Sequence, residues 1–376
     1  MRMKIEQFAM ERFQSTWENQ VEINLSESGV HPLRLDELLD DPGDRDSFWR
    51  QQLGYTQTNG TPPLRDAVAA LYQGATRDHV EITNGGAEAN FISCWHLLDR
   101  ADEAVVMVPN YMQVWGLARA FAGTVREWPL REERGARWRI DLDELERLVT
   151  SRTKLILVCN PNNPTGACLT GEELDGICRV AARHGAWVLS DEIYRGAELR
   201  EGDTPSMWGR YERVIVTSGL SKAYGLPGLR TGWVLSQPAL VELLWSHHDY
   251  TTIAPGALND RLATLALQPS RRARILARTR SILRANFPVL AEWLASHADQ
   301  FAYTAPEAGA IAYVRYHEPV NSTRLVTELR ERKSVLIVPG DHFGMDGYLR
   351  IGYGAETPQL REGLDRLHDL LASLGA

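Results

Sequence analysis

The stretch Lys154-Leu-Ile-Leu-Val-Cys159 runs directly into Asn160-Pro-Asn-Asn-Pro-Thr-Gly166. After its lysine, the first part is a continuous apolar run, which is the pattern of a strand buried on both faces of a parallel sheet. The second part combines prolines, asparagines and a glycine, residues that favour a rigid polar loop. Ligands of open α/β sheets bind beyond the carboxyl ends of the strands. The stretch therefore predicts an α/β fold with a ligand site beside this loop.

The same pattern repeats on both sides of this stretch. Short apolar runs alternate with helical patterns, which predicts a parallel sheet wrapped by helices. The further predicted strands are Glu103–Val108, Ala186–Leu189, Arg213–Thr217 and Gly232–Leu235. The predicted helices between them are Gly86–Leu98, Val114–Phe121 and Gly171–His184.

The pattern changes after about Ala239, where long helical stretches begin that run to roughly Ser296. Strand-like pieces and a last amphipathic helix follow, which is typical of an α+β arrangement. These elements are Ala310–Arg315, Val335–Val338, Tyr348–Ile351 and the helix Pro358–Leu374. The predicted fold class is α/β, with a large domain (36–265) whose mostly parallel sheet is covered by helices on both faces. Residues 1–35 and 266–376 are expected to form a smaller α+β domain.

Composition excludes several classes of protein. The 376 residues carry a formal net charge of -8 and contain no basic run, so no nucleic-acid or anionic-membrane partner is expected. No apolar stretch approaches the roughly 18–20 residues that span a membrane, and the N-terminus lacks the apolar core of a signal peptide. The four cysteines form no C-x-x-C pair and lie beside no histidine cluster, so we expect no metal site and a reducing, cytoplasmic location.

A lysine and an arginine mark the first polar segment. Ser218-Gly-Leu-Ser-Lys222 follows the strand predicted to end at Thr217. A lysine in a small-residue turn at a strand end is a candidate for Schiff-base chemistry, although an exposed turn is the commoner explanation for any one lysine. Eight residues further on, Arg230 can reach the same pocket, and its planar charged group suits a phosphate.

A carboxylate marks the second polar segment, Ser190-Asp-Glu-Ile-Tyr194, which follows the strand 186–189. Asp191 needs a cationic partner or a role in a site, because burying a lone carboxylate is costly. It suits a protonated pyridine nitrogen, and Tyr194 can donate to a phenolate oxygen. The alternative for Asp191 is a helix N-cap.

Two further segments carry weaker signals. Thr83-Asn-Gly-Gly-Ala-Glu-Ala-Asn90 leads into a helix, and glycines there expose N–H groups at the positive end of the helix dipole, which is an anion site. Pro109-Asn-Tyr111 follows the strand 103–108. Tyr111 can stack on a planar ring, although an isolated tyrosine at such a place more often belongs to the core or its rim.

Taken together and in order, these segments resemble the fold-type I pyridoxal-5′-phosphate (PLP) enzymes, specifically the class I/II aminotransferases. The resemblance covers nearly the whole chain, and motifs in this order and spacing are hard to reconcile with coincidence. The motifs are Gly54–Gly60 with Leu64-Arg65, Thr83–Ala89, Pro109–Tyr111, Asn160–Gly166, Ser190–Tyr194, Ser221–Gly232 and Leu349–Gly352.

The resemblance implies PLP as the cofactor and assigns a role to each matching residue. It implies that Lys222 holds PLP as a Schiff base and carries a proton, that Asp191 pairs with the pyridine nitrogen, and that Arg350 binds the substrate α-carboxylate. Gly29 and Asn163 are expected beside the substrate. The other implied cofactor ligands are Asn163 and Tyr194 at the phenolate oxygen, Tyr111 on the ring, Gly86, Ala87, Ser221 and Arg230 at the phosphate, and Tyr55 at the neighbouring subunit's phosphate. The implied assembly is a homodimer with shared active sites.

The chain departs from the family pattern in two places. Many relatives carry Ser or Thr three residues before the lysine, where this chain has Gly219, so Ser218 becomes the candidate for the phosphate hydroxyl. The segment Leu25-Ser-Glu-Ser-Gly-Val-His31 replaces the common substrate loop. It resembles the opening of capreomycidine-synthase-like enzymes, which use PLP to cyclise a hydroxylated arginine.

The resemblance implies an aminotransferase that moves an amino group between an amino acid and a 2-keto acid. Elimination, replacement or cyclisation on an arginine-derived amino acid is the alternative, because all these reactions begin from the same carbanion. Glu27 near the substrate would favour a cationic side chain, although an exposed glutamate is the commoner case. A non-enzymatic regulator would usually carry a DNA-binding domain, for which we see no room before Gln52.

Overall fold

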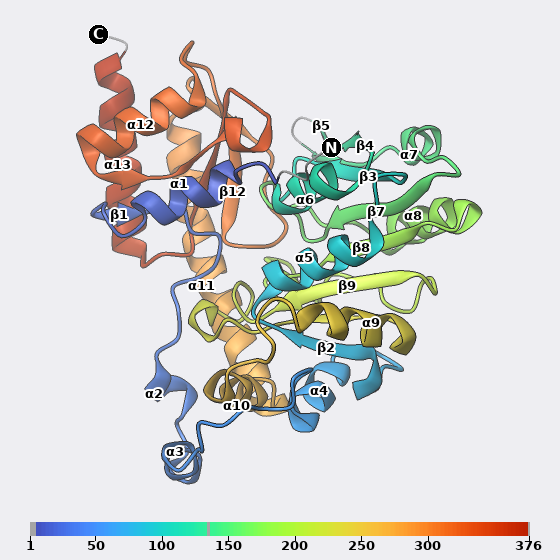
Figure 1. Cartoon of the computed structure of the whole chain (residues 1–376). Helices are drawn as coiled ribbons and strands as arrows, with labels where there is room; N and C mark the ends of the chain where they lie inside the picture. Colours follow the sequence, from blue (N-terminus) through green and yellow to red (C-terminus); the bar gives the residue numbers. More distant parts are fainter. Residues whose placement is uncertain (1–4, 134–135, 375–376) are drawn as a thin grey trace.

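The computed structural model describes residues 5–133 and 136–374 and shows a large sheet with helices on both sides (Figure 1). The strand order in this sheet is β2 (Val80–Thr83), β10 (Gly232–Leu235), β9 (Val214–Gly219), β8 (Trp187–Asp191), β7 (Thr153–Cys159), β3 (Glu103–Val108) and β4 (Thr124–Pro129). β10 runs antiparallel to both of its neighbours, and the other pairs are parallel. The predicted mostly parallel sheet is therefore confirmed.

The strands are buried on both faces, as their continuous apolar sequences predict. Along β7, Ile156 and Val158 join one cluster of buried side chains, whereas Leu155 and Leu157 join the other. Successive side chains of a strand point to opposite faces, so each face needs its own cover. The helices of this part are α4 (Pro62–Ala69), α5 (Gly86–Leu97), α6 (Gln113–Phe121), α7 (Leu142–Leu148), α8 (Gly171–His184), α9 (Pro238–His248) and α10 (Ala257–Ala266).

The ends of α8 follow from its sequence. The Thr170 hydroxyl accepts a hydrogen bond from the Glu173 N–H, and the Glu173 carboxylate accepts from the Thr170 N–H, which forms a capping box. Gly185 ends the helix with φ of 67°, a left-handed conformation that glycine adopts without steric cost. The predicted helix over 171–184 is confirmed at both ends.

A second, smaller sheet follows the long helix α11 (Pro269–Ser296). Its antiparallel strands have the order β11 (Phe301–Tyr303), β12 (Ile311–Tyr316), β15 (Tyr348–Gly352) and β14 (Val338–Pro339). The helices α12 (Ser322–Lys333) and α13 (Thr357–Leu374) accompany it. The expected α+β arrangement after the long helices is therefore present.

The N-terminal segment packs on this smaller part. Figure 1 shows α1 (Ala9–Trp17) and β1 (Ile23–Asn24) beside α12 and α13, at the opposite end of the sequence. β1 pairs in parallel with β13 (Val335–Leu336). The chain then crosses to the large part through α2 (Leu35–Leu38) and α3 (Pro42–Trp49). These contacts support the proposed division of the chain into a large domain, residues 36–265, and a smaller domain made of residues 1–35 and 266–376. The second boundary falls inside the last turn of α10.

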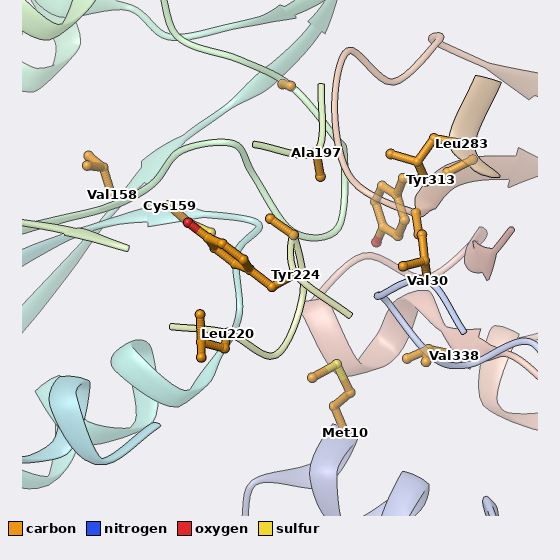
Figure 2. Close-up of a cluster of buried hydrophobic side chains, with 14 of the residues drawn as sticks. Met10, Val30, Val158, Cys159, Ala197, Leu220, Tyr224, Leu283, Tyr313 and Val338 are labelled. Carbon is orange, nitrogen blue, oxygen red and sulfur yellow. The ribbon is translucent and has the colours of Figure 1, made fainter. Parts of the chain in front are cut away.

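The two parts share a continuous apolar core. Figure 2 shows Leu220 and Tyr224 of the large part in the same cluster as Tyr313 and Val338 of the smaller one. Met10, from the N-terminal segment, contributes to it as well. A common core favours one relative placement of the two parts, so residues from all three regions can build one site.

The sequence missed some elements of this fold. β2 and β4 were not expected, and the single strand expected over 335–338 is divided between β13 and β14, which belong to different sheets. β4 lies at the sheet edge with only Trp128 buried, so it lacks the continuous apolar signal of the central strands. The remaining short elements are β5 (Arg131–Glu133), β6 (Arg137–Arg139), η1 (Arg77–His79), η2 (Pro227–Leu229) and η3 (Gly340–Phe343). No helix of the described residues is both long and apolar enough to cross a membrane.

Candidate active site

A cavity of about 450 Å³ opens where the carboxyl ends of the central strands meet the N-terminal segment and β15. This is the position at which open α/β sheets bind ligands. Its lining residues are Phe8, Met10, Glu11, Gln14, Glu18, Glu27, Ser28, Gly86, Ala87, Asn90, Tyr111, Gln113, Cys159, Asn163, Asp191, Ile193, Tyr194, Ser221, Lys222, Pro227, Arg230 and Arg350. Of the predicted site residues, the structure brings together in this cavity Gly86, Ala87, Tyr111, Asn163, Asp191, Tyr194, Ser221, Lys222, Arg230 and Arg350.

Lys222 lies in a turn that follows β9 and is partly buried. Its ammonium forms an ion pair with the Glu27 carboxylate at 3.4 Å. The attraction of Lys222 lowers the pKa of Glu27 below its ordinary value, against the opposing effect of burial. Gly29 lies against this lysine, because a Cβ at position 29 would stand 3.6 Å from Lys222 Cδ.

Asp191 ends β8 as a buried carboxylate that is held by neutral donors. Asn90 Nδ2 donates to Asp191 Oδ2 at 3.0 Å, and the Ile193 N–H donates to Oδ1 at 3.1 Å. Asn90 is oriented in turn by Thr217, whose hydroxyl donates to Asn90 Oδ1 at 2.7 Å. Burial raises the pKa of Asp191, and these two hydrogen bonds only partly oppose the shift. Within the described residues no cationic side chain compensates Asp191, so its environment favours a cationic ligand.

Glycines and Arg230 form a cradle at the start of α5. Gly85 precedes the helix with φ of 88° and ψ of 165°, and a Cβ there would stand 2.5 Å from Arg230 Nη2. A Cβ at Gly232 of β10 would lie 2.4 Å from the Gly85 carbonyl carbon. The guanidinium therefore lies directly over the backbone that leads into the N-terminal N–H groups of α5. Such an arrangement binds a phosphate.

The loop after β7 assigns different tasks to its three asparagines. Asn160 Oδ1 accepts from the Leu169 N–H at 2.8 Å, and Asn162 Nδ2 donates to the Pro109 carbonyl at 3.0 Å. These two side chains hold the loop in place. Asn163 instead faces the cavity, where its Oδ1 accepts from Arg350 Nη1 at 3.0 Å. Its amide nitrogen is therefore the group that Asn163 can offer to a ligand.

Arg350 on β15 is fully buried at the wall of the cavity. Its Nη2 donates to the Ser26 carbonyl at 2.5 Å, and its Nε has no hydrogen-bond partner among the described residues. Burial lowers the pKa of Arg350, while the nearby Tyr194 and Glu27 oppose this shift. A buried guanidinium without a paired carboxylate is suited to bind the carboxylate of a ligand.

The two cavity tyrosines both contact the N-terminal segment. Tyr194 donates to Ser28 Oγ at 2.8 Å, so its hydroxyl is engaged within the protein in this structure. Tyr111 donates to Glu11 Oε1 at 2.8 Å, and its ring packs edge-on against Phe8 at 5.1 Å between ring centroids. Burial first, and Glu11 second, raise the pKa of Tyr111 well above its ordinary value. Tyr111 is therefore a neutral ring fixed at its hydroxyl end.

Two residues expected to bind the cofactor lie outside this cavity. Ser218 is buried on β9, where its hydroxyl donates to the Glu192 carbonyl at 3.2 Å. Tyr55 is 91% exposed at the surface. The expected phosphate hydroxyl at position 218 is thus engaged elsewhere, whereas the exposure of Tyr55 is compatible with a role in another subunit.

Sequence reasoning missed several residues of the cavity. The motif Thr83–Asn90 includes Asn90 without indicating a role for it, although Asn90 follows Gly86 by four residues on the same face of α5. Glu11 and Glu18 belong to none of the predicted motifs. They lie seven residues apart, two helical turns along α1, and this spacing was the signal available. Their approach to the cavity depends on the pairing of β1 with β13, which the sequence does not indicate.

Comparison with known proteins defines the class of this chain. The family model "Aminotransferase class I and II" matches residues 49–367, most of the sequence. This chain therefore belongs to the class I/II aminotransferase family of fold-type I PLP enzymes, and its cofactor is PLP.

Individual relatives differ in their reactions. Capreomycidine synthase of Streptomyces vinaceus is 32% identical over 357 residues, which cover 94% of this chain and 91% of the relative. The crystal structure of a PLP-dependent aminotransferase from Streptococcus suis has a TM-score of 0.92 and 31% identity, with 99% of both chains covered. The PLP-dependent cyclase OrfR has a TM-score of 0.88 and 28% identity, with 100% of this chain and 99% of the other covered.

The cavity fits PLP on the evidence of its own groups. Asp191 is a buried carboxylate without a compensating cation among the described residues, which a pyridinium nitrogen would supply. Gly85 and Gly232 leave no room for a Cβ at the cradle beneath Arg230, which suits the close approach of a phosphate. Lys222 lies in the same cavity. Charge and shape therefore agree with the cofactor of the family.

Proposed function

We propose that this chain is an aminotransferase that moves an amino group between an amino acid and a 2-keto acid, with PLP held through Lys222. One observation carries the proposal: Lys222, the buried carboxylate Asp191 and the buried guanidinium Arg350 line one cavity. These are the three groups needed to attach the cofactor, to keep its ring protonated and to orient an amino acid by its carboxylate.

Each side chain has a distinct task in the proposed reaction. When bound, PLP supplies an electron sink that is conjugated with the substrate Cα. Asp191 maintains the positive charge of the ring nitrogen, because a carboxylate held by Asn90 is placed to accept that N–H. Arg350 binds the substrate α-carboxylate, and Asn163 fixes the orientation of Arg350. Positioning of this kind can contribute about 7–11 kcal/mol to lowering a barrier.

Lys222 is the proposed proton carrier. Its amine would hold PLP and, when free, would take the proton from the substrate Cα and deliver it to the atom that becomes protonated in the product. Its flexible four-carbon side chain allows this movement. The small residue Gly29, which is not part of the cavity lining itself, packs against this lysine, and a Cβ there would stand 3.4 Å from the Ser221 carbonyl oxygen. A larger side chain at position 29 would restrict the lysine.

A second candidate reaction is elimination, replacement or cyclisation on an arginine-derived amino acid. The likeness to capreomycidine synthase and to the PLP-dependent cyclase OrfR supports this candidate. It uses the same proton removal at Cα, so Lys222, Asp191 and Arg350 keep their tasks. The two candidates differ in the fate of the amino group.

Product analysis separates the two candidates. The purified enzyme would be incubated with a panel of amino acids, with and without a 2-keto acid, using both pyruvate and 2-oxoglutarate as acceptors. Aminotransfer gives a keto acid from the donor and a new amino acid from the acceptor. Products that form without any acceptor, either ammonia or a cyclised amino acid, would rule out aminotransfer and establish the second candidate.

We further propose that the enzyme is a cytoplasmic homodimer. Trp49, Leu53 and Tyr55 are three exposed large apolar side chains within one short segment, and Tyr250 is exposed on a turn of the same large part. Exposed large apolar side chains support association with a second copy, and Tyr55 is proposed to reach the partner's phosphate site. Light scattering of the purified protein measures the mass; a monomer at micromolar concentration would contradict this proposal.

A further inference from the structure

Three glutamates from the N-terminal segment line one side of the cavity. Glu11 and Glu18 come from α1 and its C-cap, and Glu27 comes from the loop that follows β1. Glu11 accepts a hydrogen bond from the Tyr111 hydroxyl, and this contact fixes the Glu11 carboxylate beside the place expected for the cofactor ring. We refer to Glu11, Glu18 and Glu27 as the acidic wall.

The acidic wall is not balanced once the proposed groups take their partners. The cationic residues of the cavity lining are Lys222, Arg230 and Arg350. Arg230 lies over the phosphate cradle, and Arg350 is assigned to the substrate α-carboxylate. Lys222 is the present ion-pair partner of Glu27, at 3.4 Å, but it is the residue that carries the cofactor. The acidic wall therefore retains negative charge without a fixed cationic partner in the lining.

The carboxylates of the wall also influence one another. Burial, followed by repulsion from Glu27 and Glu11, raises the pKa of Glu18, and Lys222 opposes this shift. A cation between these side chains would remove that repulsion, whereas a second anion would increase it. The geometry and the charges thus both favour a positive group at this side of the cavity.

Resting on the proposed function, we infer that the acidic wall binds a cationic group in the side chain of the amino-acid substrate, an ammonium or a guanidinium. The substrate α-carboxylate binds Arg350, and its side chain extends toward Glu18 and Glu27. The substrate cation then takes the place that the Lys222 ammonium occupies beside Glu27 in the present structure. Amino donors with a second carboxylate are disfavoured, because the acidic wall would repel that negative charge.

Matched substrate pairs test this inference. L-arginine and L-citrulline have nearly the same shape but differ in charge, and so do L-lysine and L-norleucine. Consumption of each amino acid by the PLP-loaded enzyme would be measured as kcat/KM. We expect the charged member of at least one pair to be preferred by roughly 10-fold or more, which is the range of one hydrogen-bonded charge pair. Glu18→Gln and Glu27→Gln should each reduce that ratio by a similar factor.

The control is Glu22→Gln. Glu22 is an exposed glutamate of the same segment that pairs with Arg366 and lies outside the cavity. This variant should keep the wild-type ratio. Turnover of the neutral substrate within each preparation reports that the variant is folded and loaded.

The possible outcomes distinguish a failure of the proposed function from a failure of the role inferred for the acidic wall. If no amino acid of the wider panel is consumed with either acceptor, the proposed function itself is wrong, and the inference is lost with it. If neutral and charged members react equally, or if both wall variants keep the wild-type ratio, the acidic wall does not select the substrate. The proposed function would survive that second result.

Discussion

Replacing Gly85 with alanine tests the phosphate cradle, because the added Cβ would stand 2.5 Å from Arg230 Nη2. The guanidinium is the end of a flexible side chain, so it would move away and leave the phosphate position. Loss of one charge-assisted hydrogen bond costs about 1.5–3 kcal/mol, which corresponds to a roughly 10- to 150-fold weaker affinity for PLP. The backbone at φ of 88° and ψ of 165° adds a folding cost of about 1–3 kcal/mol for a residue with a side chain.

The matched control is Gly74→Ala. Gly74 also has a positive φ, 78°, but a Cβ there meets no atom within 4 Å. The Gly74→Ala variant should have a free energy of unfolding lower by about 1 kcal/mol and an unchanged affinity for PLP. Titration of the apoenzyme with PLP, followed by absorbance, gives the affinity, and chemical denaturation gives the stability. Wild-type affinity in the Gly85→Ala variant would refute the placement of the phosphate beneath Arg230.

Three further predictions concern single side chains. Lys222→Ala should abolish the visible absorbance of lysine-bound PLP and all turnover, and retained turnover would remove the assigned role. Asn90→Ala should leave PLP bound but reduce kcat roughly 10-fold, because Asp191 loses a hydrogen bond that favours its charged form; an unchanged kcat would contradict this. Burial lowers the pKa of His248, but its contacts with Glu81 and a second glutamate outweigh that effect and raise it to about 9. Protonated His248 therefore stabilises the fold below pH 6.5, and this contribution is lost as the pH rises through 9. Denaturation at pH 6 and pH 9.5 should show a larger loss in the wild type than in His248→Gln, where the raised pKa of the buried Glu81 still makes stability fall with pH.

The positions of the chemical groups were predictable because they depend on strand ends. β7 and β8 lie side by side in parallel with Cys159 opposite Asp191 in register. The polar loops that follow two such strands must meet at one edge of the sheet. Placing the loop 160–166 and Asp191 at one site needed only the direction of the strands, which the alternation with helices indicates. The choice of Asn163 among the asparagines of this loop came from the family resemblance.

The partners of these groups were less predictable because they depend on tertiary packing. Asn90 reaches Asp191 only through the placement of α5 over the end of β8, across 101 residues of sequence. Ser218 directly follows Thr217, whose hydroxyl donates to the cavity residue Asn90. The side chain of Ser218 nevertheless points away from the cavity and donates to the Glu192 carbonyl. Successive strand residues face opposite sides of the sheet. A shift of one position therefore decides whether a side chain can bind a ligand or makes a contact within the protein.

The residues proposed for the chemistry and the residues proposed for substrate choice come from different parts of the chain. The family model matches residues 49–367, which include Lys222, Asp191 and Arg350. The acidic wall lies entirely before this match, between Glu11 and Glu27. Family membership therefore accounts for the cofactor, whereas the groups proposed to meet the substrate side chain come from a segment that the family model does not match. Because the N-terminal segment is anchored by pairing of β1 with β13, it can change its sequence facing the cavity without altering the sheet that holds the cofactor. Relatives with nearly the same fold can thus act on different amino acids, and the residues to compare among them are those at positions 11, 18 and 27.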